Sequence, residues 1–172
     1  MAKTYYTVDD LSVGDILTET VMDESRINMS NLIVPPMVRA VRSTNQAISH
    51  DTSTAIQFNA TDDFDTDAMH DTVTNNTRIT FNTAGVYLLV ADVQYTAASD
   101  NEQSITIRAD GSTSIDSIGH GDVLKNLNLT AIYEFSAAQY VELLTYQNNS
   151  GAGARNVTAA FSAVWQGRTT AP

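Results

Sequence analysis

The sequence has no cysteine, so it can form no disulfide and offers neither a thiol nucleophile nor a cysteine ligand for zinc. It also lacks long apolar runs: no window approaches the roughly 20 apolar residues that a membrane-spanning helix needs. The amino-terminal stretch MAKTYYTVDD contains no signal-peptide core. We therefore expect a protein that is made in the cytoplasm, is not inserted in a membrane and is stabilised by packing alone.

Basic residues are scarce. There are 9 of them against 20 acidic residues, which gives a formal net charge of -11, and the only lysines are Lys3 and Lys125. Such a chain repels a phosphate backbone, which argues against nucleic-acid binding. Because the remaining polarity comes from Thr, Ser, Asn and Gln, the composition favours strands and turns over helices.

Apolar and polar residues alternate with period two after Pro36, and turn residues interrupt the alternation about every ten residues. In VYLLVADVQY one face is apolar from Tyr87 to Tyr95 and the other turns polar at Asp92, which predicts a strand in the middle of a sheet that is buried on both faces at one end only. No helix-length amphipathic stretch separates the strands, so a parallel βαβ fold has no support. We predict an all-β antiparallel sandwich over residues 37–172. Its predicted strands are 37–43, 54–58, 77–81, 86–96, 103–109, 113–118, 124–135, 140–148 and 157–167.

Residues 1–36 have a different pattern. Thr7 and Asp10 are spaced as a capping box, helical spacing follows, and the pair Pro35 and Pro36 ends any helix before it. We predict a short, partly helical amino-terminal anchor. Its apolar residues are the candidates for docking onto a larger particle: Leu11, Ile16, Leu17, Val21, Ile27 and Leu32.

Three stretches of the strand region resemble the C1q and tumour-necrosis-factor-like (C1q/TNF-like) jelly-roll family. RITFNTAGVYLLVADVQY is similar to the family's strand, small-residue-Gly turn and Tyr-containing strand. KNLNLTAIYEFSAAQYVELLTYQN is similar to its later strand pair, and AFSAVWQG to its closing strand. This resemblance implies a C1q/TNF-like jelly roll and a homotrimer, since that family usually packs three jelly rolls around an axis.

A second resemblance covers nearly the whole chain. LSVGDILTETVMDESRINMSNLIVPPMVRAVRSTNQAI followed by FDTDAMHDTVTNNTRITFNTAG is similar to virion-associated proteins of tailed phages, in which a G-D-x-L-T anchor precedes a P-P-x-x-R-A passage into the jelly roll. It implies a virion component, assembled in the host cytoplasm, whose anchor binds a capsid, neck or tail protein. A host surface glycan or protein is then a possible partner of the displayed jelly roll.

Aromatic residues concentrate in the strand half of the chain. In a trimeric jelly roll some would fill the sandwich and others would pack between copies, where aromatic rings give close apolar contact. The candidates for the trimer interface are Tyr87, Tyr95, Tyr146, Phe161 and Trp165. The simpler interpretation places them in the core of one chain.

The acidic run DDFDTDAMHD places carboxylates at alternate positions, as a hard cation such as calcium requires. Asp62, Asp63, Asp65 and Asp67 are the candidate ligands. The run lacks the Gly and Glu of an EF-hand loop, and the alternative is a solvated loop whose carboxylates cap turns. No other cofactor is indicated.

No catalytic residues are predicted. A glycosidase needs two carboxylates a few ångströms apart, and Glu134 and Glu142 would qualify only on neighbouring strands of one hairpin. The sequence therefore predicts a non-enzymatic virion structural protein, a trimeric jelly roll displayed as capsid decoration, head fibre or tail fibre, with a stabilising or host-adhesion role. The alternatives are a free C1q-like ligand-binding module and, less favoured, a surface-polysaccharide depolymerase.

Overall fold

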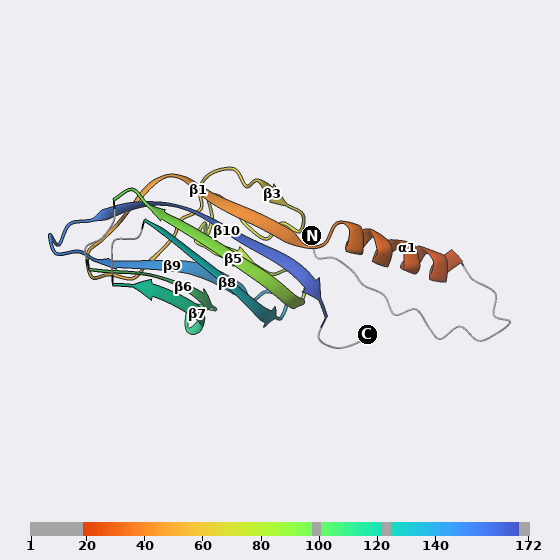
Figure 1. The fold of residues 1–172 in the computed structure, drawn as a ribbon. Coiled ribbons are helices and arrows are strands. Elements are labelled where there is room, and N and C mark those ends of the chain that lie inside the picture. Colours follow the sequence, from red (N-terminus) through yellow and green to blue (C-terminus); the bar gives the residue numbers. More distant parts are fainter. Residues whose placement is uncertain (1–18, 98–100, 122–124, 169–172) are drawn as a thin grey trace.

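The computed structural model describes residues 19–97, 101–121 and 125–168. Within these ranges a helix precedes a series of strands (Figure 1). The elements are α1 (Glu19–Ile33), β1 (Met37–Ile48), β2 (Thr54–Ala55), β3 (Phe64–Asp65), β4 (Arg78–Thr80), β5 (Gly85–Tyr95), β6 (Glu102–Ala109), β7 (Thr113–His120), β8 (Asn126–Phe135), β9 (Tyr140–Asn148) and β10 (Arg155–Gly167).

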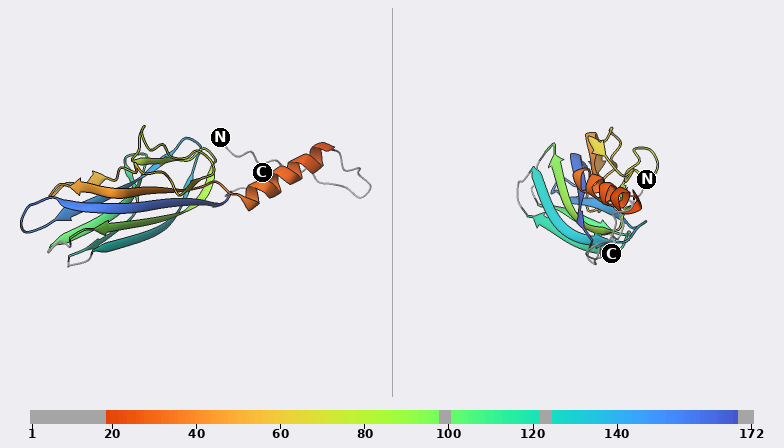
Figure 2. Two further views of the ribbon diagram at one scale, coloured as in Figure 1. Left: turned by 90° about the horizontal axis from the view of Figure 1, so that it is seen from above. Right: turned by 90° about the vertical axis from the view of Figure 1, so that its right-hand side faces the viewer.

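The strands form two sheets that pack as a sandwich, with the strands along its long axis (Figure 2). Sheet A has the order β3-β1-β10-β5-β8, and sheet B has the order β2-β9-β6-β7, with β4 also paired to β9. All these pairs are antiparallel. The predicted all-β antiparallel sandwich is confirmed, and β5 lies inside a sheet, between β10 and β8, as its alternation predicts.

The core lies between the sheets and follows from the period-two alternation. On β5 every second residue from Tyr87 to Tyr95 is buried, and on β10 the same holds from Val157 to Trp165. Phe81 and Phe135 stack within this core, with ring centroids 3.8 Å apart. The apolar side of each strand is therefore the side that the opposite sheet covers.

A polar contact crosses this apolar core. The hydroxyl of Tyr95 on β5 meets the Thr145 hydroxyl on β9 and donates to the Tyr146 carbonyl at 2.9 Å. Tyr95 is 1% exposed, and burial raises the pKa of its hydroxyl to about 12. The contact ties sheet A to sheet B near the end of the sandwich that lies away from α1.

Each predicted strand overlaps an observed one. The predicted strand 54–58 is longer than β2, because the Ile56 amide makes the last bond to β9, at the Leu143 carbonyl, and Phe58 donates instead to the Asn76 carbonyl. β3 was not predicted, since Phe64 and Asp65 lie inside an acidic run without alternation. Asp110 and Gly111 connect β6 to β7 as a hairpin and both have positive φ, 46° and 71°, which suits these residue types.

The predicted helix is present as α1. The Val34 amide still donates to the Ser30 carbonyl at 3.0 Å, and Pro35 and Pro36 then stop the helix and lead into β1. The capping box at Thr7 and Asp10 lies outside the described residues. Among the described residues, no helix has the length and apolar character needed to cross a membrane. The division of the chain into units 1–36 and 37–172 stays a prediction.

Candidate assembly interface

The outward face of sheet A is apolar over half its length. Val86, Leu88 and Val90 alternate with the buried residues of β5 and so point away from the core. In the ladder Leu88 lies opposite Val164 on β10 and Ile132 on β8. Ile132 is 68% exposed and Val90 is 41% exposed, so this surface is open in a single chain.

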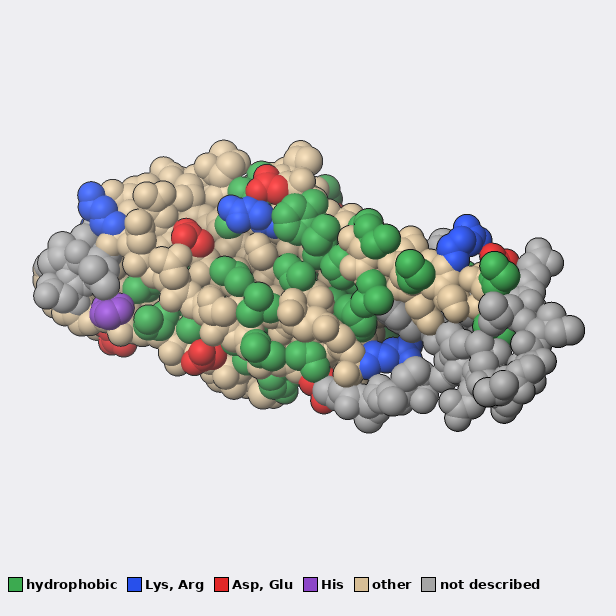
Figure 3. All heavy atoms as spheres, turned by 45° about the vertical axis from the view of Figure 1, so that its right-hand side comes forward, with side chains coloured by type: hydrophobic (Ala, Val, Ile, Leu, Met, Phe, Trp, Pro, Cys, Tyr) green, Lys and Arg blue, Asp and Glu red, His purple; other side chains and the backbone are tan. Residues whose placement is uncertain are grey.

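The apolar half lies at the end of sheet A from which α1 projects. Met37, the first residue of β1, pairs with Val164 and extends the same row toward the helix. Figure 3 shows hydrophobic side chains gathered over the middle of the sandwich and again along the helix. We call the residues Met37, Val86, Leu88, Val90, Ile132 and Val164 the apolar face.

The other half of the same surface is polar. Asp92 follows Val90 on β5 and lies opposite Ala160 and Asn128, and a shallow hollow of about 500 Å³ lies over this region. Arg39 at its rim donates to Asp63 at 2.7 Å. The half next to α1 therefore offers the more apolar surface on which another molecule can pack, with Glu134, opposite Val86 on the edge strand β8, as a charged residue at its border.

The predicted interface aromatics lie elsewhere. Tyr87 and Phe161 are 0% exposed and Tyr95 is 1% exposed, so they are core residues and have no surface to offer another copy. Trp165 is 8% exposed, and its indole donates to the Ala84 carbonyl at 3.2 Å. For these four residues the interface prediction is wrong, because the opposite sheet already covers their side of the strand.

Tyr146 is the remaining candidate, and it is half-buried on the outer side of sheet B. Its hydroxyl donates to the Asp51 carboxylate at 2.7 Å, which raises the pKa of the Tyr146 hydroxyl. It therefore lies on the opposite side of the sandwich from the apolar face. The two cannot contribute to a single flat interface.

The signal for the apolar face was present in the sequence. Alternation in VYLLVADVQY separates two sides of the strand, and the side with Val86, Leu88 and Val90 is apolar only at its start. We interpreted that end as buried on both faces. In one chain the second sheet covers only one face of this end of β5. An exposed apolar patch of this kind is typical of an interaction surface.

The four candidate calcium ligands are held in different interactions. Asp62 contacts His70 Nδ1 at 2.9 Å, and Asp63 pairs with Arg39. Asp65 accepts from the backbone amides of Asp67, Met69 and His70, and Asp67 accepts from the Thr83 hydroxyl at 2.8 Å. Within the part of the chain that the structure describes, no three His, Cys, Asp or Glu side chains converge on a point that could hold a metal.

His70 anchors this loop from inside. Its side chain is 0% exposed, its ring lies edge-on to Phe58 with centroids 6.1 Å apart, and its Nδ1 faces the Asp62 carboxylate, which is 13% exposed. Burial raises the pKa of Asp62, and the hydrogen bond with His70 opposes that shift. The pair thus has a structural role in closing the acidic loop over the core.

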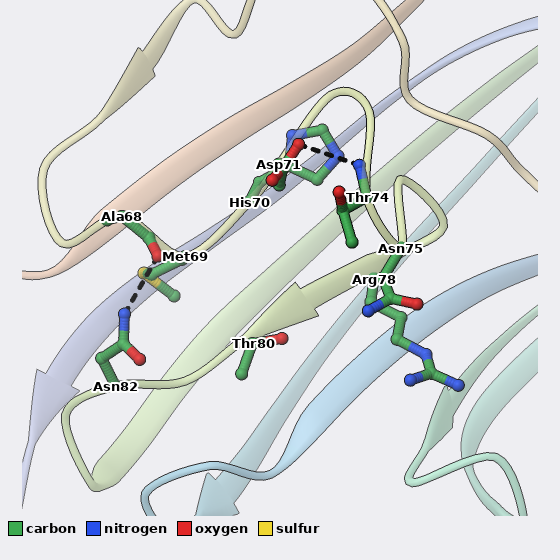
Figure 4. A pocket seen from close by; sticks show the side chains of 9 residues that line it. All are labelled: Ala68, Met69, His70, Asp71, Thr74, Asn75, Arg78, Thr80 and Asn82. Carbon is green, nitrogen blue, oxygen red and sulfur yellow. Dashed lines mark hydrogen bonds between the residues drawn. The ribbon is translucent and has the colours of Figure 1, made fainter.

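A small hollow of about 270 Å³ lies beside the loop (Figure 4). At one side Asp71 accepts from the backbone amides of Val73 and Thr74, and these bonds, that of Thr74 first, hold the pKa of Asp71 below its usual value. At the other side Asn82 donates to the Ala68 carbonyl at 3.0 Å. The hollow is shallow, Asp71 and Asn82 serve the turn itself, and Arg78 lies over the Tyr140 ring, so these groups are not arranged around a common point for catalysis.

The two glutamates considered for a glycosidase are in different sheets. Glu134 is on β8 in sheet A and Glu142 is on β9 in sheet B, and both face outward, on opposite sides of the sandwich. Glu142 is buried beneath Arg108, whose Nη2 lies 2.9 Å from its Oε2. The supposition that β8 and β9 form one hairpin is wrong, because the chain changes sheets between them.

The docking candidates are only partly within the described residues. Val21, Ile27 and Leu32 lie on α1, and Leu32 is 68% exposed whereas Val21 and Ile27 are half-buried. Leu11, Ile16 and Leu17 lie outside the described residues.

Comparison with solved structures identifies the fold. The globular domain of zebrafish complement 1qA superposes with a TM-score of 0.60 at 13% identity, covering 78% of this chain and 99% of that domain. The Eiger TNF of S. frugiperda gives 0.61 at 13% identity, with 80% and 96% covered. Vertex protein P5 of PRD1 gives 0.58 at 10% identity, with 76% and 97% covered. The chain therefore has a C1q/TNF-like jelly-roll fold, as expected. No protein-family model and no curated protein sequence matches it.

Proposed function

We propose that this jelly roll is a non-enzymatic structural protein of a tailed-phage particle, displayed on the particle surface as a homotrimer. The observation that carries the proposal is the apolar face, which is open in a single chain and has Glu134 at its border, although the chain as a whole carries a net charge of -11. An exposed apolar patch with a polar border is typical of a protein interface.

Three copies around one axis are the arrangement that best uses this face. The patch lies on one side of the sandwich only, and cyclic symmetry brings the same patch of every copy to the axis. The polar half of sheet A, with Asp92 and Asn128, then lies toward the end of the interface and keeps contact with water. The C1q/TNF-like fold supports the same arrangement.

The particle location rests on two likenesses. One is the likeness in fold to the PRD1 vertex protein. The other is the sequence resemblance of residues 11–48 and 64–85 to virion-associated proteins of tailed phages. In this proposal residues 1–36 attach the trimer to a capsid, neck or tail protein, after assembly in the host cytoplasm.

The end of the sandwich that points away from α1 is then the outermost part of the particle surface. The turns that follow β1 and β9, near residues 49–53 and 149–154, lie at this end (Figure 1). Three copies per trimer, repeated over a particle, convert a weak contact of such turns with a host glycan or protein into a strong one. Reinforcement of the particle and adhesion to the host are both compatible with this display.

The trimer is tested by light scattering of the full chain and of two charge-matched variants. Ile132→Asp places a carboxylate in the apolar face, at a side chain exposed enough for the fold to tolerate it, and we expect a monomer. Asn126→Asp makes the same change of charge on the same face of β8 but in its polar half, and we expect a trimer. A monomeric unmodified chain would overturn the proposal.

The location is tested by probing purified particles with an antibody against the chain. We expect the chain to co-purify with intact particles and the antibody to decorate their surface. A trimer that is absent from particles favours the free C1q-like binding module. A depolymerase is disfavoured by the separation of Glu134 and Glu142, and loss of polysaccharide viscosity on incubation with the trimer would revive it.

A further inference from the structure

The helix α1 leaves the sandwich and carries its own apolar stripe. It extends beyond the end of sheet A in the direction of the strands, in both Figure 1 and Figure 2. Met22, Met29, Leu32 and Ile33 are 61%, 63%, 68% and 77% exposed. Water therefore reaches most of the apolar surface at these positions in a single chain.

These four residues share one side of the helix. At about 100° per residue they fall within an arc of about 100°, which is the width of a packing stripe. Met22 and Met29 are seven residues apart and Leu32 follows Met29 by three, which is the spacing of a helix that packs on another helix. Ser25 falls within the same arc and Arg26, which pairs with Asp23, lies at its border, whereas Ser30 lies about 60° outside it.

A helix of this length has little stability in water without a packing partner. Isolated helices shorter than about 12 to 15 residues are marginal in water, and most helix stability in proteins comes from packing an apolar side. α1 has 15 residues, and the apolar side that would stabilise it is exposed. A partner must therefore cover the stripe if the helix is to persist.

We infer that the partner is α1 of the other copies, so that three helices form a short parallel bundle on the axis of the trimer. The inference rests on the proposed function. Pro35 and Pro36 connect α1 directly to β1, and the apolar face lies at that same end of sheet A, so an axis along the face runs past the root of each helix. The stripe itself carries no charge, which allows three acidic chains to meet there.

The jelly roll and the helix support one another in this arrangement. Two heptads alone bury too little surface to hold three chains together. Once three jelly rolls associate, they hold the helices at a high local concentration, and packing becomes effectively intramolecular. In this assembly Leu32 contacts another copy, and attachment to the particle falls to other residues of segment 1–36.

Because the sequence has no cysteine, any disulfide in a single-cysteine variant must join the introduced residues of two chains. Met29→Cys in the full chain places a thiol in the stripe, and Ser30→Cys places one on the adjacent residue outside it. Disulfides form only when the two Cα atoms approach within about 7 Å. Under mild oxidation of dilute protein we expect Met29→Cys to give a disulfide-linked dimer band at least about ten-fold stronger than that of Ser30→Cys. Because only two of the three cysteines in a trimer can pair, about two thirds of the chains is the upper limit for this dimer.

Light scattering of the same samples distinguishes failure of the helix bundle from failure of the proposed trimer. A trimer in which Met29→Cys and Ser30→Cys crosslink equally weakly overturns the helix bundle and leaves the proposed trimer standing. A monomer overturns both.

A second pair of variants tests whether a particle protein covers the stripe instead. We expect Met29→Glu to lose the helical far-ultraviolet signal of the free trimer, and Ser30→Glu to keep it. If both variants keep the signal and Met29→Glu loses only attachment to particles, a particle protein is the partner and the inference is overturned.

Discussion

Gly85 lies directly against the indole of Trp165. A Cβ on Gly85 would come within 2.2 Å of Trp165 Nε1, and the backbone at Gly85 has a φ of 148°, which side-chain-bearing residues rarely adopt. The contact occurs where β5 begins, so this close approach sets how Trp165 closes that end of the core. Glycine at position 85 is required both by space and by backbone conformation.

The first prediction concerns this position. We expect Gly85→Ala to lower the free energy of unfolding by about 3 kcal/mol, since overlap in a packed core and backbone strain add. Urea denaturation measures it. Two control variants separate steric overlap from backbone strain. Gly167 has a φ of 154° and open space around its Cα, so Gly167→Ala tests strain alone. Gly153 has open space and no strained φ, so Gly153→Ala tests neither effect. Equal losses at positions 85 and 167 would show that the indole contact contributes nothing.

The second prediction concerns Tyr95 at high pH. The pKa of its hydroxyl is about 12 in the folded chain against 10.0 in the unfolded chain. Between these values the unfolded chain releases a proton that the fold retains, so the stabilisation is complete below pH 10.0 and is lost as the pH rises toward 12. The loss amounts to roughly 3 kcal/mol.

Tyr95→Phe tests this assignment. At neutral pH it should cost about 1 kcal/mol for the lost hydrogen bonds, and the difference should shrink and reverse as the pH passes about 11. Urea midpoints of both chains across the alkaline range measure it. A difference between the two chains that does not vary with pH contradicts the prediction. Tyr133→Phe, on a half-buried ring, controls for the loss of any tyrosine.

The third prediction concerns Asp62 beside His70. Because burial raises the pKa of Asp62 in the fold, its contribution to stability is present below the unfolded value of 3.8 and is lost as the pH rises through the folded value. Asp62→Asn keeps an acceptor for His70 and removes the charge. We expect this variant to gain stability relative to the unmodified chain as the pH rises from below 3.8, as measured by urea denaturation. Asp63→Asn, which removes a neighbouring carboxylate from an exposed ion pair, is the matched control.

The fourth prediction concerns calcium. Asp62, Asp63, Asp65 and Asp67 are engaged with four different sets of partners, and a cation would have to break these bonds to gather them. We expect chelator-treated protein to show no heat of calcium binding and no shift in melting temperature when calcium is added. A saturable heat that Asp65→Asn abolishes would restore the calcium site.

Alternation was a good guide to the fold and a poor guide to the interface. It identified β5, β9 and β10, because period two marks a strand whatever its neighbours are. It could not say which side of a strand the second sheet covers. Large aromatic residues such as Tyr87 and Phe161 suit an interface and a core equally well, whereas the apolar face consists of plain aliphatic residues such as Ile132.

The calcium prediction for the acidic loop stays a prediction, and the structure shows why spacing alone is weak support for it. Carboxylates at alternate positions suit a cation if the chain is extended, but the chain turns after β3, and backbone amides reach Asp65 first. Sequence spacing gives no account of this competition. The pairing of His70 with Asp62 likewise depends on the turn and has no signature in the sequence.

The position of β10 has a consequence for synthesis of the protein. β10 is the final strand of the described chain, and it lies between β1 and β5 in the middle of sheet A. While the ribosome is still making residues 155–167, β1 and β5 have no shared neighbour and sheet A cannot close. The sandwich must therefore complete its folding after translation has passed these residues. A chain that ends before β10 would leave the facing edges of β1 and β5 unpaired, and unpaired strand edges are prone to aggregate.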